Sequence, residues 1–265
     1  MILRQLSVHV RTQNWIAVGL DFLIVVIGVF VGLQVSNWND ARQDSQEAQS
    51  ILLRLESDLE TEIIGWQRGV EYYAVARDHG LLALEAYNAE DIADPTAFLV
   101  RLYQASQRWN LTSQRGTYDE LISSGRISLI GDENMRARLA NHYLRMSSLQ
   151  NVLDSSRGEF QYRRTVRFYM NNTVQRAIRR DCGDTYVVEN TNYFYLTLPE
   201  LCSVELPLEL AIAEAERLAA NVEIEGELRF HVSVLDGQLA AMENAIGIAD
   251  STLAQVRMVR QGRQQ

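Results

Sequence analysis

The sequence predicts an all-α fold, in which an N-terminal transmembrane helix continues into an antiparallel bundle of long helices. Three observations support this fold class. One long apolar run lies near the N-terminus, amphipathic helical spacing follows it, and a hydrophobic content of 47% with only three prolines is typical of a globular chain. The predicted parts are a short cytoplasmic N-terminus (1–14), a membrane anchor (15–38) and a helical domain (39–265).

The apolar run extends from Trp15 to Trp38. A helix rises about 1.5 Å per residue, so the two tryptophans would lie roughly 34 Å apart. This length suits a hydrocarbon core about 30 Å thick, and tryptophan favours the headgroup level. A cleaved signal peptide is the alternative, but its apolar core is shorter and ends in a small-residue cleavage pattern that is missing here. We therefore predict an uncleaved single-pass anchor with Trp15 and Trp38 at its two interfaces.

Small and polar residues share one face of this anchor. Gly28 and Gly32 form a G-x-x-x-G pattern, which lets two helix backbones approach closely. The 4-3-4-3 spacing puts five residues on one face, namely Asp21, Val25, Gly28, Gly32 and Val35. We expect this face to pack against another helix, in a homodimer or on a membrane protein partner. The alternative is that the glycines have no partner and that Asp21 reaches the headgroups.

An amphipathic helix of roughly 45 residues follows the anchor and is expected to be continuous with it. Its apolar seam recurs every seven residues, at Leu52, Leu59, Trp66 and Tyr73. A coiled-coil stalk and one long helix of a bundle both fit this spacing. The bundle is favoured because Glu56 and Arg77 interrupt the seam.

Capping residues predict where the next helices begin and end. Asp94 followed by Pro95 is a helix start, and Gly125 is a left-handed helix stop. Between them, Thr117 and Glu120 fit a capping box.

Two long helical stretches complete the chain. The first is capped by Asp132 and runs roughly to Arg180, with a kink near Gly158. The second begins after Pro207 and forms one or two helices, with a break expected around Gly226.

The two cysteines, Cys182 and Cys202, flank a segment that is expected to form a loop or short strands. In an oxidising compartment they could form a disulfide, whereas two buried free thiols are the alternative. The short N-terminal segment is easily retained in the cytoplasm, and the cysteine pair favours an outside domain. These features predict a single-pass membrane protein with its N-terminus in the cytoplasm and its helical domain outside.

Two segments carry a family resemblance. The anchor sequence DFLIVVIGVFVGLQVSNWND covers 21–40, and TYDELISSGRISLI with the following DENMRARLANHY covers 117–143. In these motifs, their order and their rough spacing, the chain resembles an uncharacterised bacterial single-span membrane family, domain-of-unknown-function family 6090. The resemblance covers at least the first half of the chain and leaves the C-terminal third, with its cysteine pair, unmatched. It implies a helical, envelope-associated protein, which with the predicted topology places the anchor in the bacterial inner membrane and the domain in the periplasm. It supplies no activity or catalytic residue.

Motifs for catalysis, cofactors and metals are missing from the sequence. The four histidines are scattered and are expected on the surface or on helix faces, at His9, His79, His142 and His231. We therefore expect no enzyme activity, no cofactor and no metal. The formal net charge of −9 argues against nucleic-acid binding.

An arginine-rich stretch between 157 and 180 is the clearest electrostatic feature. Within it Arg163, Arg164 and Arg167 form a candidate anion-binding cluster. The alternative is intrachain pairing with the glutamates of the following helix, between 205 and 223.

These features favour a membrane-anchored interaction or scaffolding protein of the cell envelope. Its expected partners are the lipid bilayer and, through the anchor, a second copy or another membrane protein. A ligand-binding sensory module that signals through a partner is the alternative function.

Overall fold

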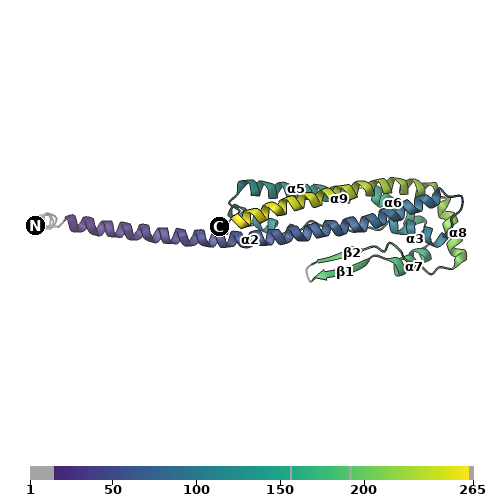
Figure 1. The fold of residues 1–265 in the computed structure, drawn as a ribbon, viewed down its shortest axis with the longest axis horizontal. Coiled ribbons are helices and arrows are strands. Elements are labelled where there is room, and N and C mark those ends of the chain that lie inside the picture. The colour runs from purple at the N-terminus through teal and green to yellow at the C-terminus, as the bar shows by residue number, and fades with distance from the viewer. Residues whose placement is uncertain (1–14, 156, 191–192, 263–265) are drawn as a thin grey trace, which may run out of the picture. The chain divides into compact units, whose positions relative to one another are not determined.

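The computed structural model describes residues 15–155, 157–190 and 193–262 (Figure 1). Most of this part of the chain is helical, which confirms the predicted all-α class. The chain divides into two compact units, of which the first ends at Ile51 and the second begins at Leu52. Helix α2 (Trp15–Tyr87) contributes to both units.

The first unit contains the N-terminal part of α2. Large apolar side chains are exposed all along it from Leu20 to Trp38. Among the described residues, α2 is the one helix that is long and apolar enough to cross a membrane. By length and composition it is therefore a candidate membrane-spanning helix.

The second unit is built on antiparallel long helices. Helix α9 (Val222–Gly262) packs against α5 (Glu133–Ser155) and α6 (Arg157–Tyr169). Ion pairs and hydrogen bonds fix the directions: Arg257 pairs with Glu56 of α2, and Arg77 of α2 pairs with Asp236. Because rising numbers on α2 meet falling numbers on α9, the two helices are antiparallel.

Shorter helices lie at both ends of this unit. At the end where α2 terminates are α3 (Pro95–Ala105), α7 (Asn172–Cys182) and α8 (Leu208–Ala219) (Figure 1). Two others, α4 (Gly116–Ser123) and the 3-10 helix η1 (Arg126–Leu129), lie at the opposite end, where α4 contacts Arg54 and Asp58 of α2. Helix α3 packs against both α7 and α8. Buried side chains of α3, α6, α7, α8 and α9 form one hydrophobic cluster around Phe98 and Tyr162.

The segment between the cysteines is an antiparallel β-hairpin. Strand β1 (Thr185–Asn190) pairs with β2 (Tyr193–Thr197), with Val187 opposite Tyr195. Leu196 is buried and belongs to a second hydrophobic cluster with Trp66 and Met242. The hairpin is thus attached to the helices through a β2 side chain.

Three of the predicted helix ends are confirmed. The Asp94 carboxylate accepts a hydrogen bond from the backbone N–H of Ala97 at 2.9 Å, directly before α3. Gly125 has a φ of 70°, the left-handed region in which glycine meets no Cβ penalty. Asp132 accepts from the N–H of Asn134 at 2.9 Å at the start of α5.

The predicted capping box is wrong. The N-cap of α4 is Arg115, two residues before Thr117, and it makes no side-chain hydrogen bond. Instead, Asp58 of α2 accepts from the N–H of Thr117 at 3.0 Å, and Glu120 pairs with Arg54 of the same helix. Tertiary contacts with α2 replace the local cap.

The helix breaks agree only in part with the prediction. Helix α5 ends at Ser155 and α6 begins at Arg157, close to the kink predicted near Gly158, but the break between α6 and α7 was not predicted, and the C-terminal break is misplaced. The stretch from Asp132 to Arg180 is divided between α5, α6 and α7, and Asn171 caps α7 by accepting from the N–H of Thr173. The C-terminal break falls before Gly226, at Asn221, whose side chain accepts from the N–H of Glu223 at 3.0 Å. In both places an asparagine provides the acceptor that starts the next helix.

Candidate functional site

The predicted membrane face lies on the exposed part of α2. Val25 and Val35 are exposed, and a Cβ added at Gly28 or Gly32 would meet no atom within 4 Å. The structure does not describe the side chains of Asp21 and Trp15, which also belong to the predicted face and interface. Trp38, the other predicted interface anchor, is 67% exposed.

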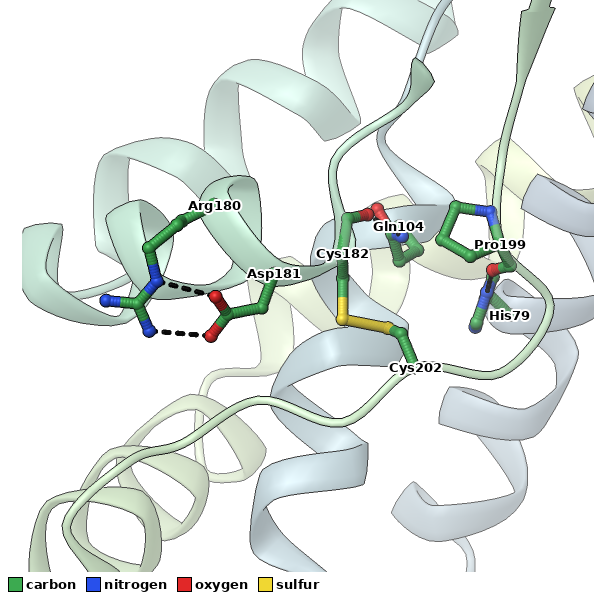
Figure 2. Close-up of a disulfide and its surroundings, with 7 residues drawn as sticks. All are labelled: His79, Gln104, Arg180, Asp181, Cys182, Pro199 and Cys202. Carbon is green, nitrogen blue, oxygen red and sulfur yellow. Dashed lines mark hydrogen bonds and ion pairs between the residues drawn. A yellow bond between two sulfur atoms is a disulfide. The ribbon is translucent and has the colours of Figure 1, made fainter.

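The structure joins Cys182 and Cys202 in a disulfide, with their Cα atoms 5.7 Å apart (Figure 2). Cys182 is the last residue of α7, and its backbone carbonyl accepts a hydrogen bond from the Gln104 side chain of α3 at 2.6 Å. The disulfide therefore fixes both ends of the hairpin segment beside α3.

The three arginines of the predicted anion-binding cluster differ in their surroundings. Arg164 is exposed on α6, whereas Arg163 and Arg167 are half-buried and point toward the C-terminal end of α3. Arg179 of α7 joins them, because its Nε contacts the Tyr103 hydroxyl at 3.2 Å. We call Arg163, Arg167 and Arg179 the arginine cluster.

Two of the glutamates expected to neutralise these arginines have other partners. Glu214 pairs with Arg217 within α8 at 2.7 Å, and Glu223 accepts from the Tyr169 hydroxyl. Arg180 pairs with its neighbour Asp181, as Figure 2 shows. Pairing with the following helix therefore does not account for the arginine cluster.

Arg167 is the most constrained member of the arginine cluster. Its guanidinium carbon lies 3.6 Å from the centre of the Tyr103 ring, and its Nη1 donates to the Tyr103 hydroxyl at 2.7 Å. Burial and the neighbouring charges of Arg163 and Arg179 lower the pKa of Arg167 to about 10.

The three histidines within the described residues lie on helices and are buried, so they take the helix-face position of the prediction and not the surface position; His9 lies outside those residues. His79 contacts the Pro199 carbonyl at 3.1 Å, and burial lowers its pKa (Figure 2). His231 contacts the Ala105 carbonyl at 2.8 Å, and burial lowers its pKa to about 4. Both therefore stay neutral at pH 7; His79 connects α2 to the loop after β2, and His231 connects α9 to the last residue of α3.

His142 belongs to a buried polar network that sequence reasoning missed. Its Nε2 lies 2.7 Å from a carboxylate oxygen of Glu62, and both side chains are 0% exposed. The other oxygen of Glu62 accepts from the Ser113 hydroxyl. On the opposite side of the ring, Nδ1 lies 3.4 Å from the Thr252 hydroxyl.

One proton of this network can be assigned from its geometry. A hydroxyl has one proton, and Thr252 donates its own to the Ile248 carbonyl at 2.9 Å. Nδ1 of His142 is then the donor to Thr252, and a second proton lies between Nε2 and the Glu62 carboxylate. A hydroxyl, an imidazole and a carboxylate in a row also occur in hydrolases, but here the hydroxyl is buried and committed to its own helix.

A polar groove of about 760 Å³ lies between α5 and α9, directly over His142 and Thr252. Amide and guanidinium side chains dominate its walls, among them Asn141, Asn244 and Arg145. Among the described residues, no group of three or more His, Cys, Asp or Glu side chains could hold a metal ion. The groove is therefore a candidate site for a polar organic ligand.

No protein-family model, no curated protein and no solved structure matches this chain. The resemblance of its two motifs to domain-of-unknown-function family 6090 therefore stays a prediction.

Proposed function

We propose that this protein is anchored in the bacterial inner membrane by α2 and presents its helical domain in the periplasm as a protein-interaction or scaffolding module. On this proposal the chain is a member of domain-of-unknown-function family 6090, and its role is binding and not catalysis. Its partners are the bilayer and a second copy or another membrane protein.

The apolar surface of α2 is the observation that carries the proposal. Phe22 is 70% exposed and Phe30 is 60% exposed, within a stretch whose large side chains are all apolar. Each Å² of apolar surface left in water costs about 25 cal/mol, so an aqueous environment disfavours this arrangement strongly. A lipid environment removes that cost, and the two exposed glycines leave room for a partner helix.

The disulfide supports the periplasmic placement of the second unit. Disulfides persist in the bacterial periplasm and are rare in the cytoplasm, where thiols are kept reduced. A disulfide that links α7 to the loop before α8 therefore agrees with an exported domain.

Thiol labelling in intact cells tests the topology. A membrane-impermeant maleimide should label nothing in untreated cells and should label the protein after an impermeant reductant is added. Cys202, which is partly exposed, is the expected site, because Cys182 is buried. The control is the Cys182→Ser, Cys202→Ser double variant, which should stay unlabelled. Labelling that needs cell lysis would place the domain in the cytoplasm and overturn the proposal.

Crosslinking in native membranes tests the interaction. The Gly28→Leu, Gly32→Leu variant should lose its crosslinked partner, because leucine side chains keep the backbones apart. The matched control is Val26→Leu with Phe30→Leu, on the opposite face of the same helix. Equal crosslinking in wild type and in both variants would remove the argument for the glycine face.

The groove between α5 and α9 favours a second candidate function, a ligand-binding sensory module. Its volume and its amide-rich walls suit a small polar ligand, and His142 lies beneath it. Such a ligand would protect the amides of α5 and α9 from hydrogen exchange, and this measurement separates the sensory role from pure scaffolding.

A further inference from the structure

We propose that the arginine cluster, together with Tyr103 and Gln107, binds the phosphate group of a small molecule. This inference does not depend on membrane anchoring or on scaffolding. It rests on how three like charges are arranged at the C-terminal end of α3.

The three guanidinium groups are linked through shared neutral acceptors. Arg167 Nη1 and Arg179 Nε lie 2.7 and 3.2 Å from the same hydroxyl oxygen of Tyr103. Arg163 Nη1 and Arg167 Nη2 lie 3.4 and 3.1 Å from the same amide oxygen of Gln107. Neutral acceptors hold the groups in place and leave their mutual repulsion uncompensated.

The charges of the surroundings do not balance the cluster. Among the described side chains, none of the three arginines has a carboxylate within ion-pair distance. Asp184 acts on Arg179 from further away and accepts a hydrogen bond from the Tyr72 hydroxyl at 3.2 Å. Three positive charges and one negative charge leave an excess of two, which matches a phosphate group near neutral pH.

Free donors are available for such a group. A guanidinium has five N–H donors, and Arg167 uses each of its three nitrogens for one bond to α3 or its C-terminal neighbours. Arg179 makes one bond within the described residues and is exposed to solvent. Forked N–H pairs of this kind suit phosphate oxygens.

Capping of α3 explains only part of this arrangement. Arg163 donates to the carbonyl of Ser106, the C-cap residue, at 2.5 Å, which also suits the helix dipole. Arg167 is retained by its stacking on Tyr103. Neither role requires Arg179, which contacts only a hydroxyl that Arg167 already occupies. The third charge is therefore the one that points to an anion.

The test is calorimetric titration of the full-length protein in detergent micelles at pH 7.5 and constant ionic strength. The ligands are inorganic phosphate, glycerol 3-phosphate and acetate. The variants are Arg179→Gln, which should keep the fold because this side chain is exposed, and Arg164→Gln, which removes the same charge from an exposed position on α6 outside the cluster.

We expect saturable binding of phosphate that Arg179→Gln weakens by at least about tenfold, as the loss of a charged hydrogen bond implies. Arg164→Gln should bind as the wild type does. Tighter binding of glycerol 3-phosphate would identify a phosphate ester as the ligand, and tighter binding of inorganic phosphate would identify the free ion. No saturable binding, equal loss in both variants, or equal affinity for acetate would overturn the proposal.

Discussion

Glu62 and His142 form a buried pair, and substitutions of the two residues should have strongly non-additive effects on the free energy of unfolding. Glu62→Leu leaves the buried His142 ring without its carboxylate partner, and it also removes the acceptor of Ser113. Breaking a fully buried pair on one side costs about 3–5 kcal/mol, because the remaining member stays buried without its partner. We expect that loss in the free energy of unfolding for Glu62→Leu and for His142→Leu alike.

The double variant separates this explanation from simple loss of packing. With both members replaced by leucine, neither stays buried without its partner, so Glu62→Leu, His142→Leu should lose far less stability than the sum of the single losses. Urea unfolding of the full chain in detergent, followed by tryptophan fluorescence, measures the three values. Glu120→Gln is the control, since Arg54 and Glu120 are 46% and 47% exposed and the loss of an exposed pair should change stability little. Single losses below about 1 kcal/mol, or additive losses, would refute the coupling of Glu62 and His142.

Three further predictions concern stability. His231 takes up a proton near pH 6.5 when the chain is unfolded and only near pH 4 when it is folded, so the unfolded state binds more protons between these values. Stability should therefore fall by up to about 1.4 kcal/mol per pH unit as the pH drops through this range. In pH-dependent urea unfolding, His231→Gln should flatten this profile. The disulfide closes a loop with a sequence separation of 20, so reductant should lower stability by about 3 kcal/mol in calorimetry, and it should have no effect on the Cys182→Ser, Cys202→Ser variant. Gly125→Ala places a side chain at a φ of 70° and should cost about 1 kcal/mol, whereas Gly116→Ala, at a position without positive φ, should cost less; equal losses in thermal unfolding would contradict the strain argument.

Periodicity was sufficient to predict the long helices. The heptad-spaced residues Leu52, Leu59 and Trp66 of α2 are all buried, and the helix continues from the apolar run without a break. Glu62 lies beside this seam and was not recognisable as a core residue. Glu62 is buried against His142, which is 80 positions away in the sequence. Because α2 packs against several helices, its buried face is wider than the heptad seam and includes Glu62.

Local rules failed where a distant group supplied the missing contact. Thr117 and Glu120 have the spacing of a capping box, yet Asp58 and Arg54 of α2 bind their backbone and side chain. Similarly, nothing in the arginine-rich stretch distinguishes Arg179 from Arg164. The distinction comes from Tyr103, because the break between α6 and α7 brings one arginine to its hydroxyl and leaves the other in solvent.

The disulfide also makes part of the chain a covalent ring. The backbone from Cys182 to Cys202, including both strands of the hairpin, is closed by the sulfur atoms. A protease that cuts one peptide bond inside this ring leaves two fragments that still migrate together. The two fragments separate on a gel only after reduction, so a single band without reductant does not show that the hairpin is uncleaved.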